Sequence, residues 1–328
     1  MTPLTPPPDF ATDEFPEEAF PPAPDTAAAY FATCRRGAAR MARLRVAVTG
    51  LARNLAPVLP LTIRRVERLC NLFADARVVI YENDSTDGTK LLLRQWAAEN
   101  PRVHVVLDDC HDPRNPPTRC LARAERMARY RDRCQRVILD RCGDFDAVIV
   151  ADLDVIGGWS LDGVRNSFGH DDWDFVGSNG LIYRREGLSI NSTRQYDMWA
   201  LRFDADLTPL PTKSGRRYAY PRGAALVPVT SCFGGLGIYA MNAYRAGRYG
   251  PADTEHAVFH RELIRRGFGR LFLNPSQILV YGRRHRFGDA AIGMLLRAWS
   301  GVAGRPAEAW TFERPPAIHP APRRVAAA

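Results

Sequence analysis

The feature that most constrains the fold of this sequence is a regular alternation of short apolar runs with helix-like segments. Apolar runs rich in β-branched residues recur at 44–50, 77–81, 103–107 and 146–155. Segments whose apolar residues repeat at helical spacing separate them, the longest being 117–139. Strands that alternate with helices form a mostly parallel sheet covered by helices on both faces. We therefore predict an α/β, Rossmann-like fold, with a smaller mixed sheet extension in the less regular second half.

Charge and proline divide the 328 residues into unequal parts. Residues 1–30 contain six acidic residues, many prolines and no lysine or arginine, so we expect a disordered arm there. The alternating pattern predicts one domain over 43–287, a C-terminal helix over 288–302 and a Pro-rich tail over 303–328.

The remaining bulk properties suggest a cytoplasmic protein. The seven cysteines include no CxxC pair, which favours free thiols in a reducing compartment. No apolar run approaches the roughly 18 residues of a membrane span, and the N-terminus lacks the pattern of a signal peptide. Because residues 1–30 carry −6 and the whole chain +9, the rest carries +15. This excess favours peripheral contact with the inner membrane face, although an arginine-rich composition also follows from a GC-rich genome.

Polar residues follow the first two predicted strands. Thr49 and Gly50 follow the first strand, and Glu82, Asn83 and Asp84 follow the second. In open α/β sheets, ligands bind at the carboxyl ends of the strands. We therefore expect these residues to lie beside a ligand.

The most specific motif is DLD, where the fourth predicted strand ends. Residues i and i+2 of an extended chain face the same side, so Asp152 and Asp154 converge on one ligand while Leu153 points inward. Carboxylate oxygens suit Mg²⁺ or Mn²⁺, which also bind substrate phosphates. The motif predicts a metal–diphosphate site; an exposed turn with two acids is the alternative.

Arg131 lies on the apolar stripe of the predicted helix 117–139. A buried guanidinium without a partner is costly, so Arg131 requires carboxylates or a phosphate. The pattern fits a phosphate-binding residue and a structural ion pair equally well.

The helix predicted over 254–267 begins with Glu255 and His256. Either side chain at a sheet edge can accept a proton from a hydroxyl group, although an acid at this position also caps a helix. His260 follows His256 by four residues and so could share a metal with it, but the HExxH pattern of zinc proteases is absent.

Two further segments carry weaker signals. His285 ends a strand-like run with two arginines before it, which suits a metal ligand beside a diphosphate or a solvated basic turn. The adjacent Gly234 and Gly235 permit close approach of a ligand to the backbone, or serve a turn.

In this order, the motifs resemble those of the GT-A nucleotide-sugar glycosyltransferases over about residues 43–285. The matching segments are VAVTGLARN, YENDSTDGT, RMARYRDRC, VADLDV and TEHAVFHRELIRRGF, with His285 at the place of a C-terminal metal ligand. YENDSTDGT, YDMWALR and VPVTSCFGG most resemble the fungal capsule-associated mannosyltransferase family and its bacterial relatives. The chain departs from the pattern at Glu82-Asn83, where two acids are common, at Asp132, where asparagine is common, and at His256, where aspartate is usual.

The resemblance implies a metal-dependent glycosyltransferase that uses Mn²⁺ or Mg²⁺ and a UDP- or GDP-linked sugar. The implied acceptor is a hydroxyl group of a glycan or lipid-linked glycan in surface polysaccharide biosynthesis. The implied metal ligands are Asp152, Asp154 and His285, and the catalytic residues are Glu255 and His256. The implied donor-binding residues are Thr49, Gly50, Arg53, Glu82, Asn83, Asp84, Arg131 and Asp152. The implied acceptor-side residues are Asp197, Gly234 and Gly235.

Two other functions remain open from the sequence. A sugar-nucleotide pyrophosphorylase has a related fold, but its Gly-rich triphosphate loop is poorly matched by VTGLARN. A basic nucleic-acid-binding module would show a reader motif or interleaved aromatic and basic residues, which this sequence lacks, so we expect no nucleic-acid partner.

Overall fold

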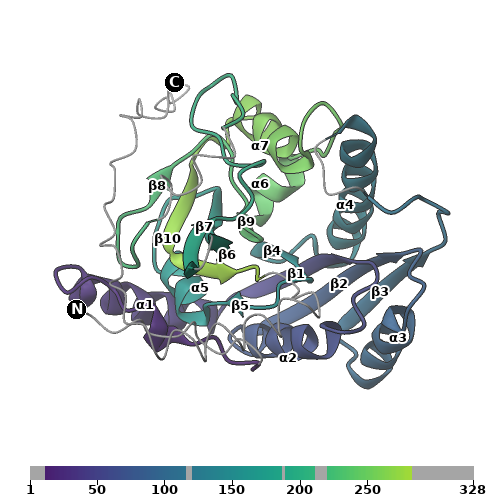
Figure 1. Ribbon diagram of the computed structural model, residues 1–328, viewed down its shortest axis with the longest axis horizontal. Coiled ribbons are helices and arrows are strands. Elements are labelled where there is room, and N and C mark those ends of the chain that lie inside the picture. The colour runs from purple at the N-terminus through teal and green to yellow at the C-terminus, as the bar shows by residue number, and fades with distance from the viewer. Residues whose placement is uncertain (1–11, 116–119, 187–188, 211–219, 283–328) are drawn as a thin grey trace.

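A ten-stranded sheet organises the protein (Figure 1). The computed structural model describes residues 12–115, 120–186, 189–210 and 220–282. The strand order is β3-β2-β1-β4-β9-β6-β10-β5, with β7 paired to β6 and β8 to β10. The strands are β1 (Arg45–Ala52), β2 (Asp75–Asn83), β3 (Val103–Asp108), β4 (Ala147–Asp152), β5 (Gly158–Trp159), β6 (Phe175–Glu186), β7 (Ser189–Gln195), β8 (Val227–Pro228), β9 (Leu236–Ala240) and β10 (Leu271–Val280).

Six of these strands run in the same direction. β1 pairs in parallel with β2 and β4, and β2 pairs in parallel with β3. β9 lies antiparallel between β4 and β6, after which β6 and β10 are again parallel. The predicted α/β fold, with a mostly parallel sheet and a smaller mixed extension, is confirmed.

Helices cover both faces of the sheet (Figure 1). They are α1 (Ala27–Met41), α2 (Leu59–Cys70), α3 (Thr89–Glu99), α4 (Leu121–Cys142), α5 (Leu161–Phe168), α6 (Met241–Ala246) and α7 (Glu255–Arg265), with a short 3₁₀ helix, η1 (Glu17–Ala19). α1, α2, α3 and α5 share one hydrophobic cluster, which contains Val48 and Ile80. A second cluster, with Ala47 and Val79, joins α4, α6 and α7 to the other face. Alternate residues of one strand thus supply both cores, as the period of two requires.

The second half differs from the sequence-based prediction in one strand. The sequence predicts two short strands, RLFLN and QILVYG, but the structure contains a single strand, β10. Its register against β6 shifts between Asn274 and Ile278. Pro275 lies in this interval and lacks a backbone N–H, so the sequence there resembles the end of a strand.

The structure describes the N-terminal segment from residue 12 as folded against the domain, whereas the sequence predicts a disordered arm over 1–30. The Glu17 carboxylate accepts hydrogen bonds from Arg222 Nη2 at 2.6 Å and from the backbone N–H of Asp162 at 3.1 Å. Arg222 is buried, and the pairing offsets the cost of burying its charge. This ion pair, together with the pairs of Arg68 with Asp13 and Glu14, anchors a segment that has no periodic apolar pattern, and α1 begins shortly after it.

The other terminal expectations lie outside the described residues. Residues 1–11, the predicted helix over 288–302 and the predicted tail over 303–328 belong to this group.

His260 is a structural residue, which corrects the idea that it shares a metal with His256. Its Nδ1 lies 2.9 Å from the Ser231 hydroxyl and its Nε2 lies 3.0 Å from the Tyr239 hydroxyl. Both ring nitrogens are therefore engaged within the core.

This burial predicts a pH dependence of stability. Burial lowers the pKa of His260 to about 3, whereas an unfolded histidine titrates near about 6.5. The stability that the neutral His260 contributes is fully present above the pKa that this residue has in the unfolded chain. It is lost as the pH falls toward its lower pKa in the folded protein. We expect His260→Gln to be less stable than the unchanged protein near neutral pH. Below about pH 6 its free energy of unfolding should fall less steeply with pH, the two slopes differing by up to about 1.4 kcal/mol per pH unit.

Urea unfolding at several pH values measures this slope. The exposed His111 provides a control, since His111→Asn should keep the slope of the unchanged protein. An unaltered slope in His260→Gln would contradict the prediction.

Candidate active site

Asp152 ends β4 at the edge predicted for ligand binding. Its backbone N–H donates to the Gly235 carbonyl at 2.8 Å. Its Oδ1 accepts from Arg131 Nη2 at 3.2 Å, and its Oδ2 accepts from the Tyr196 hydroxyl at 3.0 Å. Burial raises the pKa of Asp152 to about 7, against the opposing effect of Arg131. Its carboxylate therefore has a fixed orientation.

Asp154 is exposed two residues further on, and Leu153 between them is buried, as the sequence predicts. The Tyr281 hydroxyl donates to Asp154 Oδ2 at 3.1 Å. The charge of Asp154 also helps to raise the pKa of Asp152. The two acids thus lie two residues apart where β4 ends.

Arg131 lies on α4 with only 3% of its surface exposed. Its Nε is 3.8 Å from Glu255 Oε1, and its guanidinium carbon lies 5.3 Å from the centre of the Phe233 ring. Burial lowers its pKa, but Asp152 and Glu255 hold that pKa above its ordinary value. Nε and Nη1 have no hydrogen-bond partner. The ion pairs compensate the buried charge but leave two donors unused.

Glu255 and His256 form the first turn of α7. His256 is buried and stacks on Phe233, with 3.8 Å between the ring centres. Neither ring nitrogen has a hydrogen-bond partner, although Nε2 lies 3.7 Å from Glu255 Oε1. Burial, and then the charge of Arg131, lower the pKa of His256 well below its ordinary value. Burial and Arg131 therefore both favour the neutral form of the His256 imidazole.

A cavity of about 400 Å³ brings together Asp152, Arg131, Glu255 and His256, whereas Asp154 is not among its lining residues. α4, the segment after β7 and the start of α7 form its walls. Its lining combines acids, arginines and aromatic rings: Arg123, Met127, Arg131, Asp152, Tyr196, Asp197, Trp199, Phe233, Asp253, Glu255 and His256 are among them. An aromatic surface beside carboxylates suits a polyhydroxylated ligand, because rings pack against C–H faces and carboxylates accept hydroxyl protons.

The residues predicted for the acceptor side divide between two positions. Asp197 lines the cavity, and burial raises its pKa well above the ordinary value. Gly234 and Gly235 have φ values of +65° and +89°, and neither is among the cavity-lining residues. A Cβ on Gly235 would approach Leu279 Cδ2 to 2.8 Å and Tyr196 Cε1 to 3.2 Å. Gly235 thus makes room for the Tyr196 ring.

Thr49 and Gly50 lie inside β1 and not after it. Thr49 is buried, and a Cβ on Gly50 would lie 2.6 Å from Leu153 Cγ. Arg53 follows the strand and donates to the backbone carbonyls of Asp112 at 2.6 Å and Pro113 at 3.1 Å. All three residues have packing or bonding roles at this edge.

The residues that end β2 are also bonded within the protein. Glu82 is fully buried; its Oε1 accepts from the Ser85 N–H at 2.8 Å, and its Oε2 has no partner. The Asn83 amide donates to Asp84 Oδ2 at 2.8 Å. Asp84, at a φ of +54°, also accepts from the backbone N–H groups of His111 and Asp112. Their contact with a nucleoside stays a prediction.

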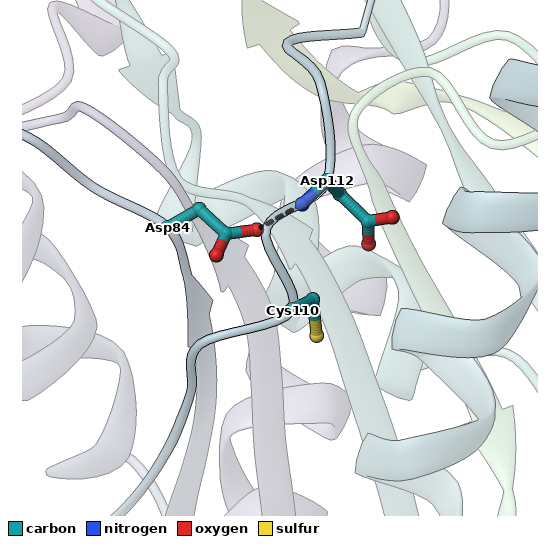
Figure 2. Close-up of side chains that lie close together, drawn as sticks. All are labelled: Asp84, Cys110 and Asp112. Atoms are coloured by element: carbon teal, nitrogen blue, oxygen red, sulfur yellow. Dashed lines mark hydrogen bonds between the residues drawn. The ribbon is translucent and has the colours of Figure 1, made fainter.

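Asp84, Cys110 and Asp112 have ligand atoms within 4.8 Å of one another. Figure 2 shows that the Asp84 carboxylate binds the Asp112 backbone N–H, whereas the Asp112 carboxylate points away from it. The Asp112 carboxylate accepts from Tyr130 at 2.7 Å and from Arg129. These hydrogen bonds explain why Asp84, Cys110 and Asp112 lie close together: they link the segments that follow β2 and β3 to each other and to α4.

Sequence reasoning missed the aromatic residues of the site. Tyr196 and Tyr281 bind the two carboxylates, Phe233 stacks on His256, and Trp199 lines the cavity. The sequence held two signals: Tyr281 ends the run QILVY beside a strand end, and the segments YDMWALR and VPVTSCFGG contain Tyr196, Trp199 and Phe233. His285, the predicted third metal ligand, lies outside the described residues.

Comparison with known proteins gives structural likenesses only. No family model matches the chain, and neither does any curated protein.

None of the helices within the described ranges has the length and apolar character needed to cross a membrane.

Solved structures similar to this chain include three glycosyltransferase complexes. A mannosyltransferase from Pyrobaculum calidifontis with GDP-Man and Mn²⁺ is 15% identical, with a TM-score of 0.44 over 86% of this chain and 76% of that one. GalNAc-T7 with UDP, GalNAc and Mn²⁺ is 14% identical, with a TM-score of 0.46 over 86% and 57%.

The third is glucosyl-3-phosphoglycerate synthase from Mycobacterium tuberculosis with Mn²⁺, UDP and its product, 16% identical with a TM-score of 0.41 over 80% of each chain. TM-scores below 0.5 do not place individual site residues, so the site stands on the geometry above.

The Arg131–Asp152 ion pair should have a measurable coupling energy. Removing one member of a buried ion pair leaves the other charge buried without its partner. Arg131→Met should therefore destabilise the protein by about 3–5 kcal/mol. The double variant Arg131→Met/Asp152→Asn should lose less free energy of unfolding than the two single variants lose together. The difference is the coupling energy, which we expect to be about 1–3 kcal/mol. Urea unfolding of the four proteins measures it.

Arg136 and Asp132 on the same helix provide the control. They form a pair at 2.8 Å with exposed side chains, so their coupling should stay below about 0.5 kcal/mol. Equal coupling for the two pairs would show that burial does not strengthen the Arg131–Asp152 interaction.

Proposed function

We propose that this protein is a metal-dependent glycosyltransferase of the GT-A type that uses a nucleoside-diphosphate sugar. The observation that carries the proposal is the convergence of Asp152, Arg131 and Glu255 on one cavity, with the exposed Asp154 two residues beyond Asp152. β4, α4 and α7 bring these groups together from distant parts of the sequence. The cavity offers a phosphate-binding donor and a proton acceptor, and the strand end beside it offers two carboxylates for a cation.

The donor set fits a hard divalent cation. Asp154 offers an exposed carboxylate, and Asp152 offers a second one that is already oriented. Because Arg131 lies against Asp152, we propose Asp154 as the principal ligand and Asp152 as a contact to the cation or the ribose. When bound, Mn²⁺ or Mg²⁺ would neutralise the charge of the leaving nucleoside diphosphate.

The unused donors of Arg131 fit an anionic group of the substrate. Nε and Nη1 are buried without partners, and a buried unpaired donor costs about 1–3 kcal/mol. A phosphate oxygen at the cavity would satisfy one of them. The residues after β1 and β2, chiefly Arg53 and Glu82, are the proposed surroundings of the nucleoside.

The transfer itself requires a proton acceptor. The acceptor hydroxyl oxygen bonds to the anomeric carbon of the sugar, and the bond from that carbon to the phosphate oxygen breaks. If configuration inverts, the hydroxyl proton passes to the Glu255 carboxylate; if it is retained, the leaving phosphate takes the proton and Glu255 orients the acceptor. His256 beside it lies in surroundings that favour its neutral form, and its two ring nitrogens have no hydrogen-bond partner within the protein.

We propose a glycan or lipid-linked glycan as the acceptor, which places the enzyme in surface polysaccharide biosynthesis. Asp197 and Trp199 face the cavity and supply a hydrogen-bond acceptor and an aromatic surface for a sugar ring. The excess positive charge outside residues 1–30 supports a cytoplasmic enzyme that contacts the inner membrane face peripherally.

A donor screen with Mn²⁺ tests the proposal. Release of UDP or GDP from a panel of UDP- and GDP-linked sugars, including GDP-mannose, identifies both sugar and base. Pyrophosphate release from nucleoside triphosphate and sugar phosphate would instead identify a pyrophosphorylase. Absence of nucleotide-sugar binding to the full chain, with and without Mn²⁺, would exclude the proposal.

Asp154→Asn should abolish Mn²⁺-dependent binding of the nucleoside diphosphate while the protein stays folded, because Asn keeps the shape and removes the charge. Titration calorimetry with and without Mn²⁺ measures this. Asp171→Asn, a change at an exposed acid paired with Arg40, is the matched control and should bind as the unchanged protein does. Unchanged Mn²⁺-dependent affinity in Asp154→Asn would refute the metal assignment.

A further inference from the structure

Tyr196 and Tyr281 link the two carboxylates of the DLD motif. The Tyr196 hydroxyl donates to Asp152 at 3.0 Å, and the Tyr281 hydroxyl donates to Asp154 at 3.1 Å. The two rings stack with 4.4 Å between their centres and 10° between their planes. Each acid therefore has its own tyrosine, and the tyrosines contact each other.

The backbone fixes both tyrosines to neighbouring residues of one strand. The Tyr196 N–H donates to the Gly180 carbonyl at 2.7 Å, and the Tyr281 N–H donates to the Leu181 carbonyl at 2.9 Å. Both acceptors lie in β6. The Tyr281 carbonyl accepts in turn from the N–H of Ile156, in the segment that follows the DLD motif, at 2.9 Å. The backbones that carry the two rings are thus hydrogen-bonded to the sheet.

The surroundings are also shaped for these rings. A side chain on Gly235 would crowd the Tyr196 ring, and the Gly235 carbonyl holds the Asp152 backbone. On its other oxygen, Asp152 is held by Arg131. Hydrogen bonds therefore hold both side chains in place, Asp152 on both of its oxygens and Asp154 on one.

We infer that the stacked Tyr196–Tyr281 pair positions the Asp152 and Asp154 carboxylates for a divalent cation. The inference rests on the proposed function, because it assigns the cation site to these acids. Hydrogen-bond partners of metal ligands orient the ligands, and their loss typically weakens metal binding 10- to 100-fold. Tyr196 and Tyr281 are positioning residues: they act through the carboxylates and not on the substrate.

The pair also joins the cation site to the cavity wall. Tyr196 directly precedes Asp197, and both line the cavity. A cation held by Asp152 and Asp154 would therefore restrain the segment that we propose to contact the acceptor sugar.

Tyr196→Phe and Tyr281→Phe test the inference, because each keeps the ring and removes the hydroxyl. We expect each change to raise the Kd for Mn²⁺ alone by about 10-fold or more, measured by electron paramagnetic resonance of unbound Mn²⁺. The thermal midpoint without metal should stay close to that of the unchanged protein. Tyr30→Phe, in α1, removes another buried tyrosine hydroxyl and should leave the Kd unchanged.

The outcomes separate the two claims. If the unchanged protein binds Mn²⁺ and both phenylalanine variants bind it equally well or more tightly, the positioning role is wrong and the proposed function stands. If the unchanged protein binds neither Mn²⁺ nor nucleotide with Mn²⁺, both are wrong. If the variants bind Mn²⁺ weakly but also lose thermal stability markedly, the pair serves folding and the inference fails.

Discussion

The site depends on one buried charge, the guanidinium of Arg131. A cation on the core side of α4 requires anionic neighbours, and the protein supplies Asp152 from β4 and Glu255 from α7. Three elements that are distant in the sequence are therefore joined at one point. The ion pairs leave two donors of Arg131 without a hydrogen-bond partner, and Arg131 is one of the residues that line the cavity.

Aromatic side chains contact the charged residues of the site. Phe233 lies against both Arg131 and His256, so it shields the ion pair and keeps the imidazole from water. Tyr196 and Tyr281 donate hydrogen bonds to the two acids of the DLD motif. Rigid rings lose little conformational entropy when they are ordered, which makes them suited to hold carboxylates that would otherwise repel each other.

The edge formed by β1, β2 and β3 is more extensively bonded than the cavity. Arg53 and Asp84 bind the backbone of residues 111–113, so these side chains hold the loop after β3 in place. This loop and the cavity are both joined to α4, the first through Tyr130 and the second through Arg131. A single helix thus connects the proposed nucleoside edge to the proposed site of chemistry.

The sequence alone determined the parallel half of the sheet and the acidic strand end, because period-two and helical patterns are local properties of the chain. It also placed Arg131 on a buried stripe and Glu255 at a helix start, but left their partners open. Only the tertiary structure showed that β9 lies beside β4, that Glu17 anchors the N-terminal segment, and that His260 serves the core. The tyrosine pair likewise arises from the pairing of β7 and β10 with β6. Contacts between residues so far apart in the chain leave no periodic signal, so only the folded arrangement could decide them.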